Sequence, residues 1–321
     1  MGALSRGSQH FLLSKTDSYD VWRCLLTGKE LRFYYPMPRF PSVSVTGHTC
    51  MLNCKHCNSH YLNHMPIVNT PEKLKSFSAR LEAEGGIGLL ISGGSTSEGK
   101  VPLDGFYPAI RWIKDYTGLI VNIHCGLIGV SEAEEIVASG VDIASVDIVG
   151  SEETIMGVYS LSARVEDYRD ALLSLVDAGV PQVAPHICVG LDHGIIKGER
   201  RALEIASEAS PEVIVLLGLI PTAGTPMADV NPPSVEDMEK AVTWAKEASP
   251  SSEIALGCMR QRAGRIYLEE RLIEAGVTRF TLPSKETVKT ANEMGYRIRF
   301  LDGCCAIPRI LEAKGLRLDS A

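Results

Sequence analysis

The sequence predicts an α/β fold, a (β/α)8 barrel of the TIM type, complete or partial, with extensions at both ends. Short apolar runs recur from Phe40 onward and alternate with amphipathic helical stretches. Eight such repeats fill residues 40–283, a usual length for this barrel. The chain has 321 residues, of which 45% are hydrophobic, enough for one large core. A doubly wound open sheet is the competing architecture.

The expected strands are short and rich in β-branched residues. They span residues 41–47, 87–94, 119–126, 142–149, 182–190, 212–220, 252–259 and 277–282. Amphipathic patterns between them predict helices, such as Pro71 to Glu84 and Glu236 to Ala248. Asn69-Thr70 offers an N-cap before Pro71, which suits a first helical turn.

Two segments fall outside these repeats. Residues 10–35 carry a periodic apolar pattern that predicts a helix packed against the barrel. Residues 296–305 predict one more strand, which ends in paired cysteines. Because no long linker or low-complexity tract interrupts the chain, we expect a single domain over 1–321. It divides into an N-terminal extension (1–39), the barrel (40–283) and a C-terminal extension (284–321).

Composition argues against several classes of protein. The net charge of −7 gives no support for a surface that binds nucleic acid or an anionic membrane. No apolar run reaches the length of a membrane span, and residues 1–15 do not have the pattern of a signal peptide. The nine cysteines are an odd number, and three of them stand at ligand spacing. We therefore expect a cytoplasmic protein rather than a disulfide framework.

The most informative motif is Cys50-Met-Leu-Asn-Cys54-Lys-His-Cys57, directly after the first barrel strand. Three thiolates are too few to close a structural zinc site, which takes four ligands. They suit an iron–sulfur cube that leaves one iron without a protein thiolate. Zinc and unrelated thiols are the alternatives. Because an open iron can bind a small molecule, the spacing favours a catalytic metal site over a structural one.

This spacing resembles CxxxCxxC, the signature of the radical S-adenosylmethionine (SAM) enzymes. The resemblance implies a [4Fe–4S] cluster held by Cys50, Cys54 and Cys57, with SAM chelated on the open iron. It also implies that a radical derived from SAM removes hydrogen from a substrate carbon. His56 stands where the family usually has an aromatic residue that packs beside the cofactor.

Further polar positions follow the second and fourth strands. Gly93 and Gly94 let the backbone approach a ligand, and Ser92 and Ser95 add hydrogen-bonding groups. In the radical SAM family this is the GGE motif, which binds the SAM amino group, and here Ser95 replaces the glutamate. A plain tight turn is the alternative. Asp147 is an acid within an apolar strand, where the family often contacts ribose; an interior salt bridge would also satisfy it.

The sixth strand ends in a more specific segment. Residues 218–229 resemble the segment ending in GTPL that biotin synthases carry near the adenine of SAM. The resemblance assigns Pro221, Gly224 and Thr225 to cofactor binding. With the cysteine motif, it narrows the family to the biotin-synthase-like branch and covers residues 40–283.

Biotin synthases hold a second cluster through three cysteines and an arginine, of which only parts occur here. Cys125 and Arg260 match two positions, whereas Ala184 stands where the fifth-strand cysteine would fall. The resemblance therefore does not extend to biotin synthase itself. Cys188 is expected to be a buried thiol that fills space; Cys125 and Cys258 could be the same, and whether either joins a second cluster is open.

Another set of cysteines lies in the two extensions: Cys24, Cys304 and Cys305. Adjacent cysteines can both bind one cluster where the chain bends sharply, and Gly303 permits such a bend. The lipoyl synthases hold a sulfur-donating auxiliary cluster with their terminal extensions, and this chain resembles the archaeal two-component lipoyl synthases. The resemblance implies a second [4Fe–4S] cluster on these three thiols. Buried thiols without a metal are the alternative.

The implied function is a radical SAM sulfurtransferase. It would insert sulfur from the auxiliary cluster into a C–H bond of an octanoyl chain on a lipoyl carrier protein or domain. The implied partners are a second lipoyl synthase subunit and an electron donor such as ferredoxin or flavodoxin. A single-cluster radical SAM enzyme of other C–H chemistry is one alternative; a non-catalytic iron–sulfur maturation or electron-transfer module is another. The attacked carbon and the oligomeric state are open.

Overall fold

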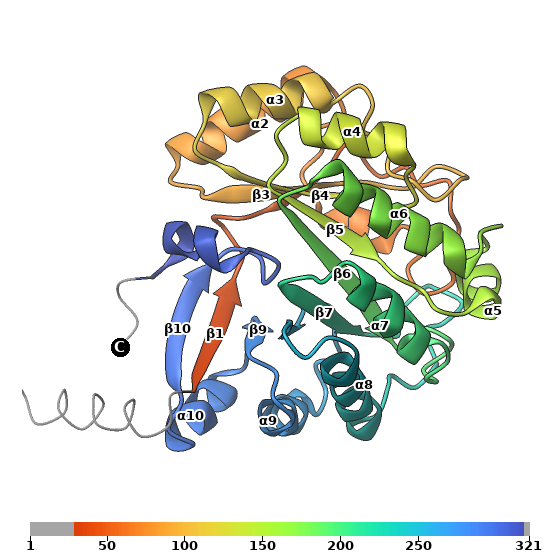
Figure 1. The fold of residues 1–321 in the computed structure, drawn as a ribbon, viewed down its shortest axis with the longest axis vertical. Helices are drawn as coiled ribbons and strands as arrows, with labels where there is room; N and C mark the ends of the chain where they lie inside the picture. The colour runs from red at the N-terminus through yellow and green to blue at the C-terminus, as the bar shows by residue number, and fades with distance from the viewer. Residues whose placement is uncertain (1–28, 318–321) are drawn as a thin grey trace, which may run out of the picture.

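The computed structural model describes residues 29–317, which form a curled half-barrel of ten parallel strands with helices on its outer face (Figure 1). The strand order is β10-β1-β9-β8-β7-β6-β5-β4-β3-β2. The strands are β1 (Glu30–Tyr35), β2 (Ser42–Ser44), β3 (Gly88–Ser92), β4 (Ile120–His124), β5 (Ile143–Asp147), β6 (Gln182–Val189), β7 (Val213–Gly218), β8 (Glu253–Leu256), β9 (Arg279–Thr281) and β10 (Arg297–Asp302). The predicted barrel-type α/β fold is confirmed in its partial form.

Helices lie between the strands from β2 onward, and α2 has the N-cap that the sequence predicts. They are α2 (Pro71–Ala83), α3 (Tyr107–Tyr116), α4 (Val130–Ala138), α5 (Glu152–Thr154), α6 (Val165–Ala178), α7 (Glu199–Glu208), α8 (Val235–Ala248), α9 (Arg265–Ala275) and α10 (Lys285–Glu293), with short turns η1 (His60–His64), η2 (Ile155–Tyr159, a π-helix) and η3 (Arg309–Gly315). At the start of α2, the Thr70 hydroxyl accepts a hydrogen bond from the Lys73 amide at 3.3 Å. Pro71 takes the first helical position.

The eight predicted barrel strands correspond to β2 to β9, and the predicted strand at 296–305 is β10. The prediction of a helix over residues 10–35 is wrong for its last part, because residues 30–35 form β1 between β9 and β10. Both faces of β1 are buried, and the three aromatic residues Phe33, Tyr34 and Tyr35 follow one another, which hides the two-residue alternation. Residues 10–28 lie outside the described part of the chain. The sheet thus takes strands from both segments assigned as extensions.

Two hydrophobic clusters lie on opposite faces of the sheet. The larger one joins the strands to the helices and is the outer core. The smaller one contains no residue of helices α2 to α10 and lines the inner, concave face; its buried members are Tyr34, Phe40, Ile87, Ile120, Ile143, Ala184, Val213, Val215, Ala255, Leu301, Cys305, Ala306 and Ile307. After β10, residues 303–307 therefore fold back onto the inner face of the sheet. Gly303 makes this bend with a φ of +123°, a conformation that favours glycine.

A buried ion network fixes that returning segment. Arg279 at the start of β9 is fully buried, and its guanidinium lies 3.0 Å from Glu212 and 2.6 Å from Glu253. The same guanidinium donates to the backbone carbonyls of Cys305 (3.1 Å) and Ile307 (2.6 Å). A buried guanidinium is tolerated only when its donors are satisfied. Arg279 therefore ties residues 305–307 to the sheet.

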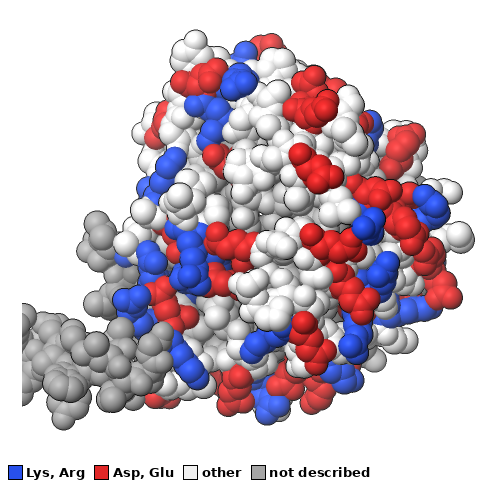
Figure 2. Space-filling view, viewed as in Figure 1, with Lys and Arg blue, Asp and Glu red and all other residues white. Residues whose placement is uncertain are grey.

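The exposed surface carries charges of both signs. Figure 2 shows lysine and arginine interspersed with aspartate and glutamate over the visible face. Within residues 29–317, no helix combines the length and apolar character needed to cross a lipid bilayer.

Candidate metal centre and cofactor loops

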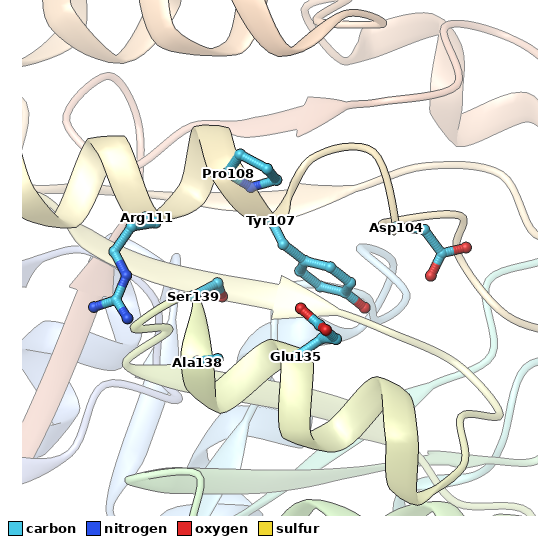
Figure 3. Close-up of a pocket in the computed structure, with 7 residues that line it drawn as sticks. All are labelled: Asp104, Tyr107, Pro108, Arg111, Glu135, Ala138 and Ser139. Carbon is cyan, nitrogen blue, oxygen red and sulfur yellow. The ribbon is translucent and has the colours of Figure 1, made fainter.

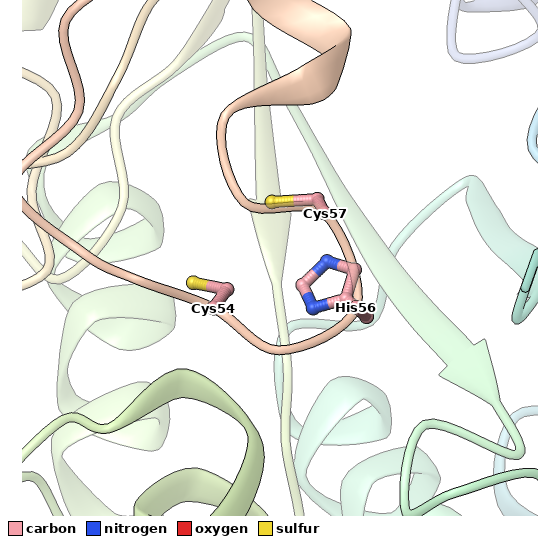
Figure 4. Close-up of side chains that lie close together, drawn as sticks. All are labelled: Cys54, His56 and Cys57. Carbon is pink, nitrogen blue, oxygen red and sulfur yellow. The ribbon is translucent and has the colours of Figure 1, made fainter. Parts of the chain in front are cut away.

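The cysteine loop follows β2 at the carboxyl edge of the sheet, where parallel α/β proteins place reactive groups. The ligand atoms of Cys54, His56 and Cys57 lie within 4.8 Å of one another (Figure 4). Cys50 lies outside this group, and its sulfur accepts a hydrogen bond of 3.3 Å from the Ser95 amide. In an iron–sulfur cube each thiolate binds a different iron, so the three sulfurs need not converge on one point.

Three contacts hold the cysteine loop in place. The Met51 amide donates to the Ser95 carbonyl at 2.8 Å, which joins the loop to the segment after β3. The Lys55 amide donates to the Val158 carbonyl of η2 at 2.8 Å. Beyond the last cysteine, the hydroxyls of Tyr61 and Thr222 lie 2.7 Å apart and join η1 to the loop after β7. The motif is therefore fixed from three sides.

The thiols of Cys54 and Cys57 titrate as a pair. The pKa of Cys57 is lowered to about 4, mainly by a hydrogen bond from the Cys54 thiol and also by the nearby His56 ring. The same hydrogen bond, with burial, raises the pKa of Cys54 far above its ordinary value. Two thiolates this close repel each other, so both ionise only beside a cation. This arrangement suits a site that binds a metal through both sulfurs.

His56, predicted to pack beside the cofactor, lies between the Cys54–Cys57 pair and the ring of Tyr159. Its ring contacts that of Tyr159 edge-on, with centroids 5.4 Å apart. Its buried Nδ1 makes no hydrogen bond within the described residues. An orphaned ring nitrogen beside two thiols fits a site that takes a further group. We read this donor set as compatible with an iron–sulfur cluster at Cys50, Cys54 and Cys57.

The segment after β3 packs directly under the cysteine loop. A Cβ atom on Gly94 would lie 2.0 Å from the Thr49 carbonyl oxygen and 2.6 Å from the Cys50 Cα. The Gly94 amide donates to the Thr46 hydroxyl at 2.7 Å. A Cβ atom added to Gly93 would lie 3.1 Å from the Thr46 hydroxyl oxygen. The predicted Gly93-Gly94-Ser95 segment is therefore brought beside the cysteines, and Gly94 is required by close approach.

Asp147 lies at the end of β5, and its side chain is exposed. Its predicted burial within the strand is therefore wrong, since the strand ends at this residue and frees the carboxylate. The alternative interpretation was an interior salt bridge, but Asp147 makes no ion pair within residues 29–317. Its charge instead acts on the neighbouring pKa values of His124 and Cys188. The carboxylate is thus available at the carboxyl edge for a ligand.

Two histidines that sequence reasoning missed stand at the same edge. His124 ends β4 and His186 lies on β6, with ring centroids 5.8 Å apart. The Ser92 hydroxyl, predicted as a cofactor contact, lies 3.3 Å from His124 Nδ1. Burial lowers the pKa of His186 to about 4 and also lowers the pKa of His124. Both rings are therefore neutral at physiological pH. The signal that could have found them is position, since strand ends supply barrel active sites.

The predicted adenine segment forms a turn after β7. Gly224 has a φ of +79°, and the Thr225 hydroxyl donates to the Thr222 carbonyl at 2.7 Å. Thr222 in turn contacts Tyr61 beside the cysteine loop, as described above. Pro221, Gly224 and Thr225 therefore lie in a segment attached to the candidate metal centre.

A second group of thiols gathers at the inner face of the sheet. The Cys304 sulfur lies 4.0 Å from the Asn122 side-chain nitrogen on β4, across the sheet from β10. Cys305 is buried beside Thr281 and is hydrogen-bonded by Cys304, which lowers the pKa of Cys305 to about 7. Cys258 follows β8; burial, and then the charge of Cys305, raise its pKa to about 11 although solvent reaches its side chain. The bend predicted for Cys304 and Cys305 thus brings them near Cys258.

The remaining cysteines divide differently. Cys24 lies outside the described residues, so its predicted place in the auxiliary set has no structural counterpart here. Cys125 is fully buried in the outer core, where burial raises its pKa to about 12. Cys188 on β6 is partly exposed, and burial raises the pKa of its thiol.

Arg260, the residue that matched the cluster arginine of biotin synthases, is engaged elsewhere. It is buried and paired with the fully buried Glu269 of α9. It also donates to the carbonyls of Gly257 (2.7 Å) and Thr281 (2.8 Å). The match to a cluster-binding arginine is therefore wrong, because the guanidinium joins β8, β9 and α9 instead.

An open surface cavity of about 480 Å³ lies between the outer helices α3 and α4. Figure 3 shows Tyr107 and Glu135 facing each other across it, with Arg111 at the opposite end from Asp104. Its walls come from helices rather than from the loops that carry the thiols. This cavity is separate from the candidate metal centre.

The sequence was compared with protein families and with known proteins. No family model matches the chain. The biotin synthase of Bordetella avium is 27% identical over 149 residues, covering 45% of this chain and 44% of the relative. The biotin synthase of Neorickettsia sennetsu is 25% identical over 229 residues, 68% of each chain. The chain thus spans under half of the first relative and about two thirds of the second.

Solved structures show the same fold. Methylornithine synthase (PylB) superposes with a TM-score of 0.59 at 17% identity, covering 89% of this chain and 90% of that one. The hydrogenase maturase HydG from Carboxydothermus hydrogenoformans gives a TM-score of 0.61 at 14% identity, covering 90% of this chain and 73% of its own. The chain is thus similar in sequence to biotin synthases and shares its fold with PylB and HydG, and its CxxxCxxC loop resembles that of the radical SAM superfamily, as expected for the biotin-synthase-like branch.

Proposed function

We propose that this protein is a radical SAM sulfurtransferase that inserts sulfur into an unactivated C–H bond of a protein-bound octanoyl chain. The similarity to biotin synthases and the CxxxCxxC loop support a [4Fe–4S] cluster and SAM as its cofactors. When bound, these groups would supply the removal of a hydrogen atom from an unactivated carbon, which amino-acid side chains do not perform. The protein's own contribution is to hold them and to place the substrate.

Each part of the carboxyl edge has a role in this proposal. Cys50, Cys54 and Cys57 would ligate the cluster, and the Ser95 amide already donates to the Cys50 sulfur. Hydrogen bonds to a ligating sulfur tune an iron–sulfur centre. The segment after β3 contacts the cysteine loop, and the turn after β7 contacts Tyr61 of η1, which follows that loop, so residues of both segments would hold SAM.

Neutral histidines suit the interior of such a site. His124 and His186 face each other near Asp147, and burial keeps both uncharged. An uncharged polar wall can hydrogen-bond an amide without adding a charge that would need solvation. The octanoyl group is amide-linked to a lysine of its carrier, so we assign these rings to the amide.

The observation that carries the sulfur-insertion part is the Cys304-Cys305 pair. These thiols are turned from the end of β10 onto the inner face of the sheet rather than left at the surface. Buried thiols near the carboxyl edge could hold the sulfur source that such a reaction consumes. The proposed partners are an octanoylated lipoyl carrier protein or domain, a second lipoyl synthase subunit, and a ferredoxin or flavodoxin.

The test is a product assay on reconstituted protein. The full chain is incubated without oxygen with SAM, a strong reductant and an octanoyl-lysine peptide, and the peptide is analysed by mass spectrometry. We expect 5′-deoxyadenosine together with a thiolated peptide. Formation of 5′-deoxyadenosine without any thiolated peptide would leave a radical SAM enzyme of other C–H chemistry. Absence of both products would favour a non-catalytic iron–sulfur module.

A further inference from the structure

The three thiols at the inner face come from two distant parts of the sequence. Cys304 and Cys305 follow β10, and Cys258 follows β8. The structure pairs β8 with β9 at Leu256 and Phe280, so Cys258 stands one strand away from the Thr281 region that faces Cys305. Arg260 reinforces this approach, because one of its nitrogens donates to both Gly257 and Thr281.

The backbone around these thiols is fixed. The Cys305 carbonyl accepts from Arg279, whose guanidinium is buried in an ion network. On the other side, the Asn122 side chain contacts the Cys304 sulfur at 4.0 Å and accepts from Ser145 at 3.1 Å. Held in this way, the two adjacent thiols lie close enough to hydrogen-bond each other, with Asn122 beside Cys304 and Thr281 beside Cys305. Both sulfurs are therefore held in place by contacts with the sheet.

The same surroundings contain polar groups without adequate partners. The Thr281 hydroxyl is buried and makes no hydrogen bond of its own within residues 29–317, and the thiol that it faces is that of Cys305. The buried Asn122 amide nitrogen has only the Cys304 sulfur as a hydrogen-bond acceptor in that part of the chain. Buried donors normally find acceptors, and both of these point at the thiols. Inorganic sulfide would supply the missing acceptors.

We propose that Cys258, Cys304 and Cys305 are the protein ligands of a second iron–sulfur cluster, inside the half-barrel. The inference rests on the proposed function, to which it gives a sulfur source, and it differs from the sequence-based set by replacing Cys24 with Cys258. A single zinc ion is disfavoured, because within residues 29–317 only Cys54, His56 and Cys57 form a group that converges on one ion. Three thiolates leave one iron of a cube for another ligand.

Iron and acid-labile sulfide per chain, measured after anaerobic reconstitution, test this assignment. We expect about eight irons in the wild-type protein and about four in the Cys258/Cys304/Cys305 triple alanine variant. The four that remain belong to the Cys50/Cys54/Cys57 site and report that the variant is folded. The single variant Cys258→Ala should also lose about four irons, and its exposed position makes it tolerant of substitution.

Two matched controls separate the alternatives. Cys24→Ala and Cys125→Ala should both keep about eight irons. If Cys24→Ala falls to about four irons while Cys258→Ala keeps eight, the assignment is overturned in favour of the sequence-based set. If the triple variant and Cys258→Ala both keep about eight irons, the second cluster lies elsewhere and only this inference fails. If wild type itself binds about four irons, no second cluster exists and the sulfur-insertion proposal fails with it.

Discussion

Gly94 offers the sharpest mechanical test of how the cysteine loop is positioned. In Gly94→Ala, the added methyl group would lie 2.0 Å from the Thr49 carbonyl oxygen and 2.6 Å from the Cys50 Cα. Ordinary van der Waals contact begins near 3.4 Å, so the loop must move by about 1.4 Å (3.4 − 2.0) to relieve the clash. Metal–ligand distances tolerate only about 0.2 Å. We therefore expect Gly94→Ala to lose the cluster at Cys50.

The cost to folding should be smaller than the cost to iron binding. Overpacking typically destabilises a protein by about 1–3 kcal/mol, which corresponds to a few degrees in Tm for a chain of this size. The assay is iron content with circular dichroism melting. Gly105→Ala is the matched control, because no atom lies within 4 Å of its added Cβ. Wild-type iron content and Tm in Gly94→Ala would refute this account of the loop.

Three further predictions follow from individual contacts. Tyr61→Phe removes the 2.7 Å contact with Thr222 and should cost about 1 kcal/mol while weakening SAM binding, measured by calorimetry; unchanged affinity would contradict a role for this contact. Burial lowers the pKa of His186 to about 4, below its ordinary 6.5, so the unfolded state takes up protons first and stability is lost as pH falls from 6.5 toward 4. Urea unfolding should show about 2 kcal/mol less stability at pH 5 than at pH 7 from this group, a difference that His186→Gln should remove. Arg260→Met leaves Glu269 buried without its partner and should destabilise the protein by about 3–5 kcal/mol in urea; a loss below 1 kcal/mol would contradict the pairing.

The period of the apolar residues and the spacing of the strand and helix patterns were sufficient to predict most of the fold. The eight barrel strands were predictable because a parallel strand buried on both faces is a short apolar run between helical patterns. Strand β1 was not, since Leu31 and Phe33 face the outer core while Tyr34 faces the inner one. Because Phe33, Tyr34 and Tyr35 are successive aromatic residues, the strand shows no clear alternation to distinguish it from a buried helix.

In the candidate site, too, residues on one loop could be predicted and contacts between distant strands could not. Cys50, Cys54 and Cys57 were found because all three lie on one loop and local spacing describes them. The proximity of Cys258 to Cys304 and Cys305 depends on the pairing of β8 with β9 and on the bend at Gly303. The interaction of His124 with His186 depends likewise on which strands are neighbours. Contacts between distant strands are set by topology, which no local pattern contains.

We expect the cysteine loop to hold an iron–sulfur cluster with one iron open to SAM. Electron paramagnetic resonance of the reduced protein, recorded with and without SAM, tests it most directly. The Cys258/Cys304/Cys305 triple alanine variant isolates the signal of the first site. We expect a [4Fe–4S] signal whose g values shift when SAM is added and which disappears in Cys54→Ala. A signal unaffected by SAM, or zinc in place of iron, would contradict the claim.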